Sequence, residues 1–445
     1  MLAMAKFYKV AHLIGAQAIN QGDHFMILPR LRAAYDSSPI GRFFAYMGPA
    51  LIVSVAYMDP GNYGTDIQGG ASFNYDLLWV VWLASAMAML LQYLSGKLGI
   101  ATDQSLAEVL REKLRERKFV IPYWLAAEAA TAATDLAEYL GTVIALNLLF
   151  GIPMIYAAVF GALDVILILA MASRRFRIIE QMFMLLVSII GIGYLYEIFI
   201  TRPDPAAIAY HSFVPTLAGN SALFLAVGVI GATVMPHALF VHSHLTASKL
   251  QGKPITEKRK MRKMHMYENI VLLTIAGFVN AAIMITAAAA FNPHNSGISS
   301  VSQAYKTLVP LFGVGAGAIF LVTLLASGIS SSVTGTIAGQ SVMEGLLGRK
   351  VNVWLRRFIT RFVNVVPTTI ALLIGLDPLN ILVYSQVILS LLIPLPMIPL
   401  VLLSKDRHLM GEFVNRQSTT FIAVAFVAVI VVLDLYLVAT SLLQR

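Results

Sequence analysis

Residues 56–64 read Ala-Tyr-Met-Asp-Pro-Gly-Asn-Tyr-Gly, a turn sequence in the middle of an otherwise apolar segment. Pro60 lacks an N–H donor and disfavours helical geometry at Asp59, and Gly61 accepts almost any backbone angle. A helix through this segment is therefore predicted to unwind here. Within a membrane, unwound backbone persists only where it is buried in protein or lines a cavity. A simple proline kink requires no carboxylate beside it, so Asp59 favours a functional break.

A second segment repeats the pattern, because residues 227–237 read Val-Gly-Val-Ile-Gly-Ala-Thr-Val-Met-Pro-His. A proline again follows small residues within an apolar run, with Met235 before it and His237 after it. Alone, the methionine is typical of core packing and the histidine of a hydrogen-bonded interior residue. Their place in a second broken helix favours a functional interpretation.

The composition places both breaks within a membrane. Of the 445 residues, 58% are hydrophobic and 12% are charged, whereas soluble domains average about 25% charged residues. So little charge cannot cover a soluble surface, and we expect an all-α integral membrane protein. A disordered chain, a fibrous repeat and a soluble enzyme are excluded. The chain has no cysteine, which excludes disulfides and thiolate metal sites.

Eleven apolar stretches are long enough to cross a bilayer, which requires roughly 20 residues each. They span residues 45–70, 76–97, 120–147, 152–172, 178–200, 221–247, 267–290, 312–342, 353–374, 379–403 and 418–441. We predict a tail at 1–44, a transporter core at 45–403 and an additional helix at 418–441. Within the core, spans 1–5 cover about 45–200 and spans 6–10 about 221–403.

The basic residues predict the orientation. With the N-terminus inside, 28 of the 32 Lys and Arg residues lie on the cytoplasmic side and three on the other, which is a strong positive-inside signal. The net charge of +9 therefore reflects topology and attraction to anionic lipid, and no nucleic-acid partner is needed. We expect a multi-pass cell-membrane protein with its C-terminus extracellular or periplasmic. Lys6 and Lys9 argue against a cleavable signal peptide.

Five spans separate the two breaks, since Asp59 lies in span 1 and Met235 in span 6. A repeat with an odd number of spans inserts its second copy upside down. Interrupted helices at matching positions of inverted halves indicate the central site of a transporter. We therefore predict a 5+5 inverted repeat in which helices 1 and 6 are broken.

The groups at the two breaks suit a cation. Asp59 offers a carboxylate, Asn62 an amide oxygen and Met235 a thioether, and unwinding frees backbone carbonyls, most plausibly at Ala56 and Ala232. No Lys or Arg is near to hold a substrate carboxylate or phosphate. Sulfur contributes little to Ca²⁺ or Mg²⁺ but favours Mn²⁺, Fe²⁺, Co²⁺ and Cd²⁺. A divalent transition metal is the predicted substrate.

The chain resembles the Nramp family (natural resistance-associated macrophage proteins) over about 45–441. The resemblance rests on residues 59–62, residues 235–237, Ala-Thr-Asp-Leu-Ala-Glu at 133–138 and Ser-Gly-Ile-Ser-Ser-Ser at 327–332. It implies a LeuT-type fold and proton-coupled import of Mn²⁺ or Fe²⁺. Its metal ligands carry over to Asp59, Asn62, Met235 and the carbonyls of Ala56 and Ala232. The resemblance also implies that Gln386 lies near the metal, as a water-mediated ligand.

Span 3 carries Glu128, Asp135 and Glu138 on one stripe, which descends about 15 Å toward the cytoplasm at 1.5 Å per residue. Arg356 and Arg357 enter the membrane from the same side. One interpretation is a static salt-bridge network that joins spans 3 and 9. The other, which the family resemblance favours, is a proton relay.

His237 follows the predicted metal site on the cytoplasmic side of span 6. A histidine side chain changes its protonation state between about pH 5 and 8, so His237 belongs to the predicted proton pathway. Gln92 and Asn280 are further polar residues within apolar spans, and His242 is a weak candidate. Asp434 is expected to sit near the outer interface. The basic loop at 249–263 is interpreted as a topology determinant.

Three other functions fit these residues less well than a proton-coupled metal importer does. A cation-coupled transporter of amino acids or small organic solutes would leave no anionic side chain in the site, so Asp59 and Met235 speak against it. Broken inverted repeats disfavour a metal channel. A membrane-embedded enzyme is disfavoured because the sequence shows no catalytic cluster. We expect a monomeric transporter without a resident cofactor, whose partners are divalent metal ions, protons and the bilayer.

Overall fold

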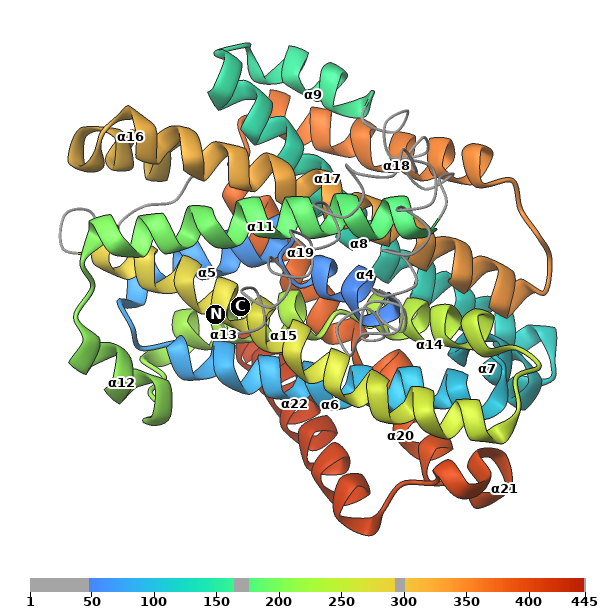
Figure 1. The fold of residues 1–445 in the computed structure, drawn as a ribbon. Helices are drawn as coiled ribbons and strands as arrows, with labels where there is room; N and C mark the ends of the chain where they lie inside the picture. Colours follow the sequence, from blue (N-terminus) through green and yellow to red (C-terminus); the bar gives the residue numbers. More distant parts are fainter. Residues whose placement is uncertain (1–47, 164–175, 293–300, 444–445) are drawn as a thin grey trace, which may run out of the picture. The chain divides into compact units, whose positions relative to one another are not determined.

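The computed structural model describes residues 48–163, 176–292 and 301–443, where every regular element is helical (Figure 1). The first half contributes α4 (Pro49–Ala56), α5 (Pro60–Phe73), α6 (Leu78–Thr102), α7 (Leu106–Leu114), α8 (Arg117–Phe150), α9 (Met154–Ala162), α11 (Phe176–Thr201) and α12 (Pro205–Phe213). The second half contributes α13 (Gly219–Val234), α14 (Pro236–Leu250), α15 (Ile255–Phe291), α16 (Val301–Phe312), α17 (Val314–Leu347), α18 (Val353–Leu373), α19 (Pro378–Leu392), α20 (Pro394–Ser404), α21 (Arg407–Met410), the 3₁₀ turn η1 (Gly411–Phe413) and α22 (Gln417–Leu443). The predicted all-α class is confirmed.

Both predicted helix breaks are present. The first separates α4 from α5, and Pro60 opens α5 at a position where a missing N–H is harmless. The second separates α13 from α14, and Met235 joins them with a positive φ of 38°. Positive φ is uncommon for a residue with a side chain, so the chain at Met235 cannot continue the helix of α13.

The count of eleven spans is not confirmed. Within the described residues, eight helical segments are long and apolar enough to cross a membrane. Of the other three predicted spans, the first is divided into the short α4 and α5, and the fourth falls partly in 164–175, outside the described residues. The ninth is α18, whose three arginines lower its apolar character. The tail at 1–44 also lies outside the described residues.

Several connections between the predicted spans are themselves helical. α7, α12, α16 and α21 lie between the long helices. In α7 the cause is local, because Ser105 and Glu108 form a capping box in which each side chain accepts a hydrogen bond from the other's backbone N–H. Sequence hydropathy missed these helices because they are too short to span a bilayer.

Glycines let the helices around the breaks approach closely. A Cβ on Gly231 of α13 would collide with the backbone oxygen of Gln386 in α19, and one on Gly70 of α5 would collide with that of Met284 in α15. Small residues at such contacts are typical of membrane helix packing. α13 is thereby held against α19 and α5 against α15, and this fixes the helix ends that form the site.

Candidate functional site

The first break buries a carboxylate with one free oxygen. Asp59 caps α5, and its Oδ1 accepts hydrogen bonds from the backbone N–H of Asn62 at 2.9 Å and from Asn62 Nδ2 at 2.7 Å. Its Oδ2 accepts no hydrogen bond from the described residues, although the side chain is fully buried. A buried carboxylate oxygen without a donor is a strong attractor for a cation.

The two prolines also release two backbone carbonyls. In a continuous α-helix each carbonyl accepts a hydrogen bond from the N–H four residues later. The fourth residue after Ala56 is Pro60, and the fourth after Ala232 is Pro236, and neither proline has an N–H. The same device therefore operates at both breaks and leaves two carbonyl oxygens without their helical donors.

Asn62 ties the two broken helices together. Its Nδ2 donates to the carbonyl of Tyr57 at 3.2 Å and to that of Ala232 at 3.3 Å. Its Oδ1 accepts from the hydroxyl of Thr233 at 3.1 Å and from Nδ2 of Asn280 at 3.2 Å. One amide thus links α5 to α13 and α15, and its NH₂ group faces a set of oxygen acceptors.

Met235 and Gln386 complete the predicted ligand set. Met235 is fully buried in the same apolar cluster as Ala56 and Met58. Gln386 packs against Gly61, where a Cβ would stand 2.7 Å from its Oε1, and this oxygen has no partner among the described residues. The structure therefore gathers all six residues predicted as metal ligands around the two breaks.

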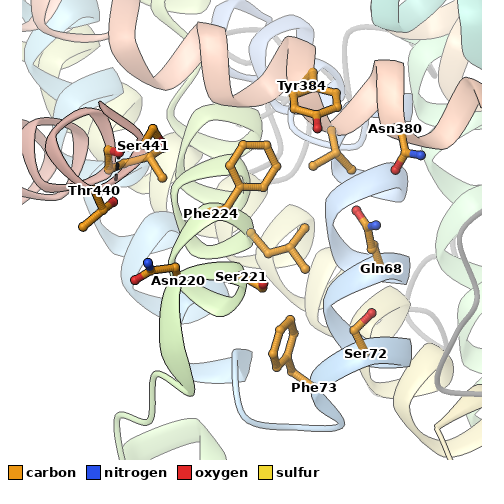
Figure 2. A pocket seen from close by; sticks show the side chains of 13 residues that line it. Gln68, Ser72, Phe73, Asn220, Ser221, Phe224, Asn380, Tyr384, Thr440 and Ser441 are labelled. Carbon is orange, nitrogen blue, oxygen red and sulfur yellow. Dashed lines mark hydrogen bonds between the residues drawn. The ribbon is translucent and has the colours of Figure 1, made fainter. Parts of the chain in front are cut away.

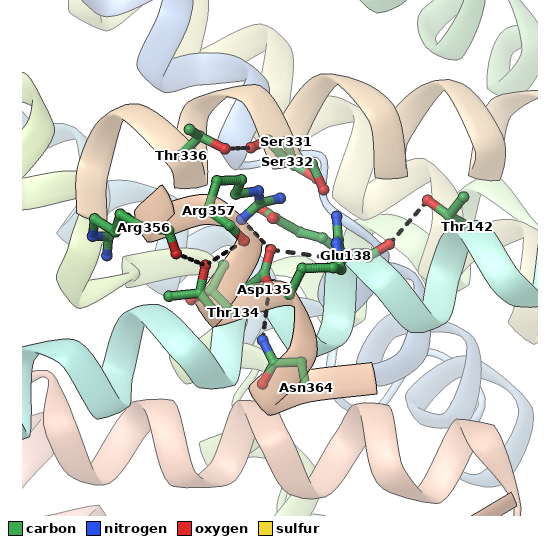
Figure 3. Close-up of polar contacts among 12 residues, drawn as sticks. Thr134, Asp135, Glu138, Thr142, Ser331, Ser332, Thr336, Arg356, Arg357 and Asn364 are labelled. Carbon is green, nitrogen blue, oxygen red and sulfur yellow. Dashed lines mark hydrogen bonds and ion pairs between the residues drawn. The ribbon is translucent and has the colours of Figure 1, made fainter. Parts of the chain in front are cut away.

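The predicted ion pairs between spans 3 and 9 are present. Arg356 Nη2 lies 2.5 Å from Glu128 Oε1, and Arg357 pairs with Asp135. Figure 3 shows Asp135 between Arg357 and Asn364, whose Nδ2 donates to Asp135 at 2.7 Å. α8 and α18 are thus joined by buried charges.

Arg361 adds a second guanidinium to this network, with its Nη1 at 3.7 Å from Asp135 Oδ1. The buried side chains of α18 are polar, while Phe358, Phe362 and other large apolar residues of this helix are exposed. An outward apolar face suits lipid, and an inward polar face suits the pairing of charges within the protein.

Glu138 differs from the other two acids of the stripe. It is fully buried, and neither carboxylate oxygen has a hydrogen-bond partner among the described residues. His237 reaches α8 at Thr134, whose Oγ1 lies 3.0 Å from His237 Nδ1, and Thr134 is one helical turn before Glu138. His237 and Glu138 are therefore brought to the same part of α8, without a direct bond between them in the structure.

Two buried polar features near the site go beyond the predicted site residues. Asp66 lies one turn beyond Asn62 in α5 and is fully buried, and neither of its carboxylate oxygens has a partner within the described residues. The signal was available, because Asp66 follows Asp59 by seven residues and so returns to nearly the same face of a helix.

The second feature is a buried polar chain that starts beside the site. Gln92 Nε2 donates to the Tyr57 hydroxyl at 2.7 Å, and Gln92 Oε1 accepts from His242 Nδ1 at 2.9 Å. The ring of His242 meets that of His265 edge-on, with centroids 4.7 Å apart. The partners of His242 lie in other helices, so the sequence of its own segment does not reveal them.

Asp434 corrects the expectation of an interfacial acid. Its side chain is only 5% exposed, and its Oδ1 accepts a hydrogen bond from Ser390 Oγ at 2.7 Å. The acid therefore turns inward and attaches α22 to α19. A buried carboxylate needs such a donor, which hydropathy alone could not identify.

A cavity of about 500 Å³ lies between the ends of α5, α13, α19 and α22 that point away from the breaks. Figure 2 shows Gln68, Asn220 and Asn380 among its polar lining residues, together with the aromatic rings of Phe224 and Tyr384. Amide side chains and the absence of acids or bases among its lining residues make this cavity polar but uncharged.

The broken helices and their packing define an all-helical membrane protein of the LeuT type. A crystal structure of MhsT in complex with L-phenylalanine shares this fold, with a TM-score of 0.56 at 14% identity over 89% of this chain and 99% of that one. Residues 50–440 match the model of the family described as natural resistance-associated macrophage protein-like, and the chain belongs to this family. The predicted family and fold class are confirmed.

The chain is similar to proteins named divalent metal cation transporter MntH. It is 44% identical to that of Burkholderia ambifaria, over 90% of this chain and 89% of the relative. It is 41% identical to that of Deinococcus radiodurans, over 92% of each. A crystal structure of a mutant manganese transporter from Eremococcus coleocola matches with a TM-score of 0.81 at 33% identity, over 90% of this chain and 87% of that one.

The buried network predicts different roles for two acids of α8. Asp135→Asn removes the carboxylate that pairs with Arg357 and faces Arg361, and we expect it to lower the free energy of unfolding by about 3 kcal/mol or more. Glu138→Gln removes no ion pair and serves as the control, with a change below about 1 kcal/mol. Unfolding of the purified protein in detergent measures both values. Equal losses in the two variants would contradict these assignments.

Proposed function

We propose that the chain imports divalent transition-metal ions, with Mn²⁺ as the main substrate and Fe²⁺, Cd²⁺ and Co²⁺ as further ones, by alternating access coupled to protons. The observation that carries this proposal is the carboxylate oxygen of Asp59 that accepts no hydrogen bond from the described residues, at the break between α4 and α5. Beside it are a thioether and two carbonyls that lack helical donors. The names of the relatives support a divalent cation as the cargo.

Cation binding would require a rotation of Asn62. Its Nδ2 lies within 2.7–3.3 Å of Asp59 Oδ1 and the carbonyls of Tyr57 and Ala232. A cation bound by the same oxygens would take the place of this NH₂ group. The side chain would then turn and present Oδ1 to the ion, which breaks the hydrogen bond that Asn280 now donates to Oδ1. Metal binding is thereby coupled to the contact between α5 and α15.

The cavity in Figure 2 is the proposed entry side. The positive-inside distribution of Lys and Arg supports an outward position for the ends of α5 and α13 that line it. Its amide and hydroxyl groups can replace water around a cation without trapping the ion, because they carry no charge. The C-terminus would lie on the same side, and the N-terminus would be cytoplasmic.

For the proton route, Glu138 and His237 are the proposed carriers. A buried carboxylate without a fixed hydrogen-bond donor can take up and release a proton, and His237 adjoins it through Thr134. Asp135 and Glu128 are held by arginines, so they supply a charged lining along the descending stripe. The proposal thus combines the salt-bridge network with the proton relay. Glu128 and Asp135 form fixed ion pairs, and Glu138 and His237 exchange protons.

The metal site is tested at Asp59. Asp59→Ala removes the only charged ligand, so Mn²⁺ binding measured by calorimetry and Mn²⁺ uptake into proteoliposomes should both be lost. Asp434→Ala is the matched control, because it removes a buried aspartate from α22 and should keep wild-type Mn²⁺ affinity. An unchanged Mn²⁺ affinity in Asp59→Ala would refute the assignment.

Selectivity is tested at Met235. The oxygen ligands suit Ca²⁺ well, so rejection of hard cations falls to the sulfur. Met235→Ala should keep measurable Mn²⁺ transport, lose Cd²⁺ affinity and become about tenfold more sensitive to competing Ca²⁺, which corresponds to about 1.4 kcal/mol. Met284→Ala makes the same change in the buried core and should keep wild-type selectivity. Equal resistance to Ca²⁺ in wild type and Met235→Ala would show that the thioether only fills space.

Proton coupling is tested at Glu138. In proteoliposomes with an internal pH reporter, Glu138→Gln should suppress proton entry during Mn²⁺ uptake while Mn²⁺ binding is largely retained. Glu197→Gln alters another buried glutamate, in α11, and should leave the proton signal intact. If proton flux is unchanged in Glu138→Gln, Asp135→Asn and His237→Ala alike, the network is purely structural.

A further inference from the structure

A second cavity, of about 600 Å³, lies where α6, α15 and the start of α22 meet. Four basic residues line it: Lys97, Arg262, Lys263 and Arg416. They come from three separate parts of the chain, so the basic segment at 249–263 is more than a topology signal. The tertiary structure gathers part of it around one cavity, together with Lys97 of α6 and Arg416, which directly precedes α22.

Protein groups leave the positive charge of this cavity unbalanced. Within the described residues, none of its four cations forms an ion pair. The one acid in the lining, Glu412, is bound to Arg259 through hydrogen bonds of 2.5–3.1 Å. These hydrogen bonds, together with the charges of Arg259 and Arg262, hold the pKa of the Glu412 carboxyl below its ordinary value. This single acid offsets only part of the positive charge that surrounds the cavity.

Aromatic rings position two of the cations. The guanidinium of Arg262 lies 5.6 Å from the ring centre of Phe413, and Lys97 Nζ lies 5.5 Å from that of Tyr93. Lys97 is also buried and donates a hydrogen bond to Asn415. Cations that stack on rings are held in place without being neutralised. The cavity therefore combines fixed positive charges with apolar lining side chains, which include Met266, Phe413 and Val414.

The position of the cavity along α15 corresponds to a membrane surface. α15 has 37 residues and is about 55 Å long at 1.5 Å per residue, whereas the hydrocarbon core of a bilayer is about 30 Å thick. The helix is therefore long enough for its basic first turns, which include Arg262, to extend beyond that core. Phosphate groups of lipids lie at this level.

We propose that this cavity binds the phosphate headgroup of an anionic phospholipid, with the glycerol and upper acyl carbons against Phe413 and Tyr93. Basic pockets between membrane helices are suited to such headgroups. A bound lipid would connect α6 and α15 to the start of α22, three segments that are far apart in the chain. The shared chemistry is that of a phosphate ester, and the apolar side chains of the lining favour a lipid over a free phosphate.

Native mass spectrometry of the full-length protein tests the proposal, after incubation in detergent with equimolar phosphatidylglycerol and phosphatidylcholine. Wild type should retain phosphatidylglycerol preferentially. Lys263→Gln with Arg416→Gln removes two exposed cations of the cavity and should lower that retention by at least fivefold. The matched control, Arg349→Gln with Lys350→Gln, removes two exposed cations from the loop after α17 and should retain lipid like wild type.

Three outcomes would overturn the proposal. Unchanged retention in the cavity variant would show that these cations do not hold the lipid, and equal loss in both double variants would show nonspecific surface attraction. Complete displacement of phosphatidylglycerol by inorganic phosphate at equal concentration would indicate a free-anion site. Matching thermal unfolding midpoints confirm that the variants are folded, and Arg262→Gln provides a second, inner variant. The readout contains no metal, so it is independent of the transport proposal.

Discussion

Two missing N–H groups organise the centre of this protein. Pro60 and Pro236 each stand four residues after an alanine whose carbonyl would otherwise be bonded within a helix. In a membrane such carbonyls must find another partner, because no water is present to satisfy them. Asn62 supplies part of that compensation through its contact with Ala232, and a cation would supply it more strongly. The break, the hydrogen-bond network and the affinity for a cation thus share one physical cause.

The buried charges around this centre fall into two groups. Asp135 and Glu128 face arginines of α18, and these ion pairs fasten α8 to a helix whose other face is apolar. Asp59 and Glu138 retain carboxylate oxygens without donors among the described residues. Paired charges contribute a fixed frame, whereas unpaired ones are available to an ion or a proton. Transport requires both, since a site that exchanges its cargo must be surrounded by helices that keep their positions.

Charged groups farther from the central site also depend on partners outside their own segment. Asp434 is satisfied by Ser390 and attaches α22 to α19. The four cations around the second cavity form no ion pair among the described residues, and an anionic lipid is their proposed counterpart. The counterpart of Asp434 thus lies in another helix, whereas the one that we propose for these cations lies in the bilayer.

The sequence by itself determined the membrane class, the two breaks and the residues that stand at them. Hydropathy, proline and a buried carboxylate act over short stretches of chain, so Asp59, Asn62 and Met235 could be recognised without a structure. Ion pairs between spans 3 and 9 were one of two interpretations that charge and helical periodicity allowed, and the structure assigned Glu128 to Arg356. The tertiary structure decided what depends on contacts between helices. It supplied the link from Asn62 to Thr233 and Asn280, the polar chain through Gln92 and His242, and the inward turn of Asp434. These groups lie up to 218 residues apart, and no local pattern records which helix face meets which.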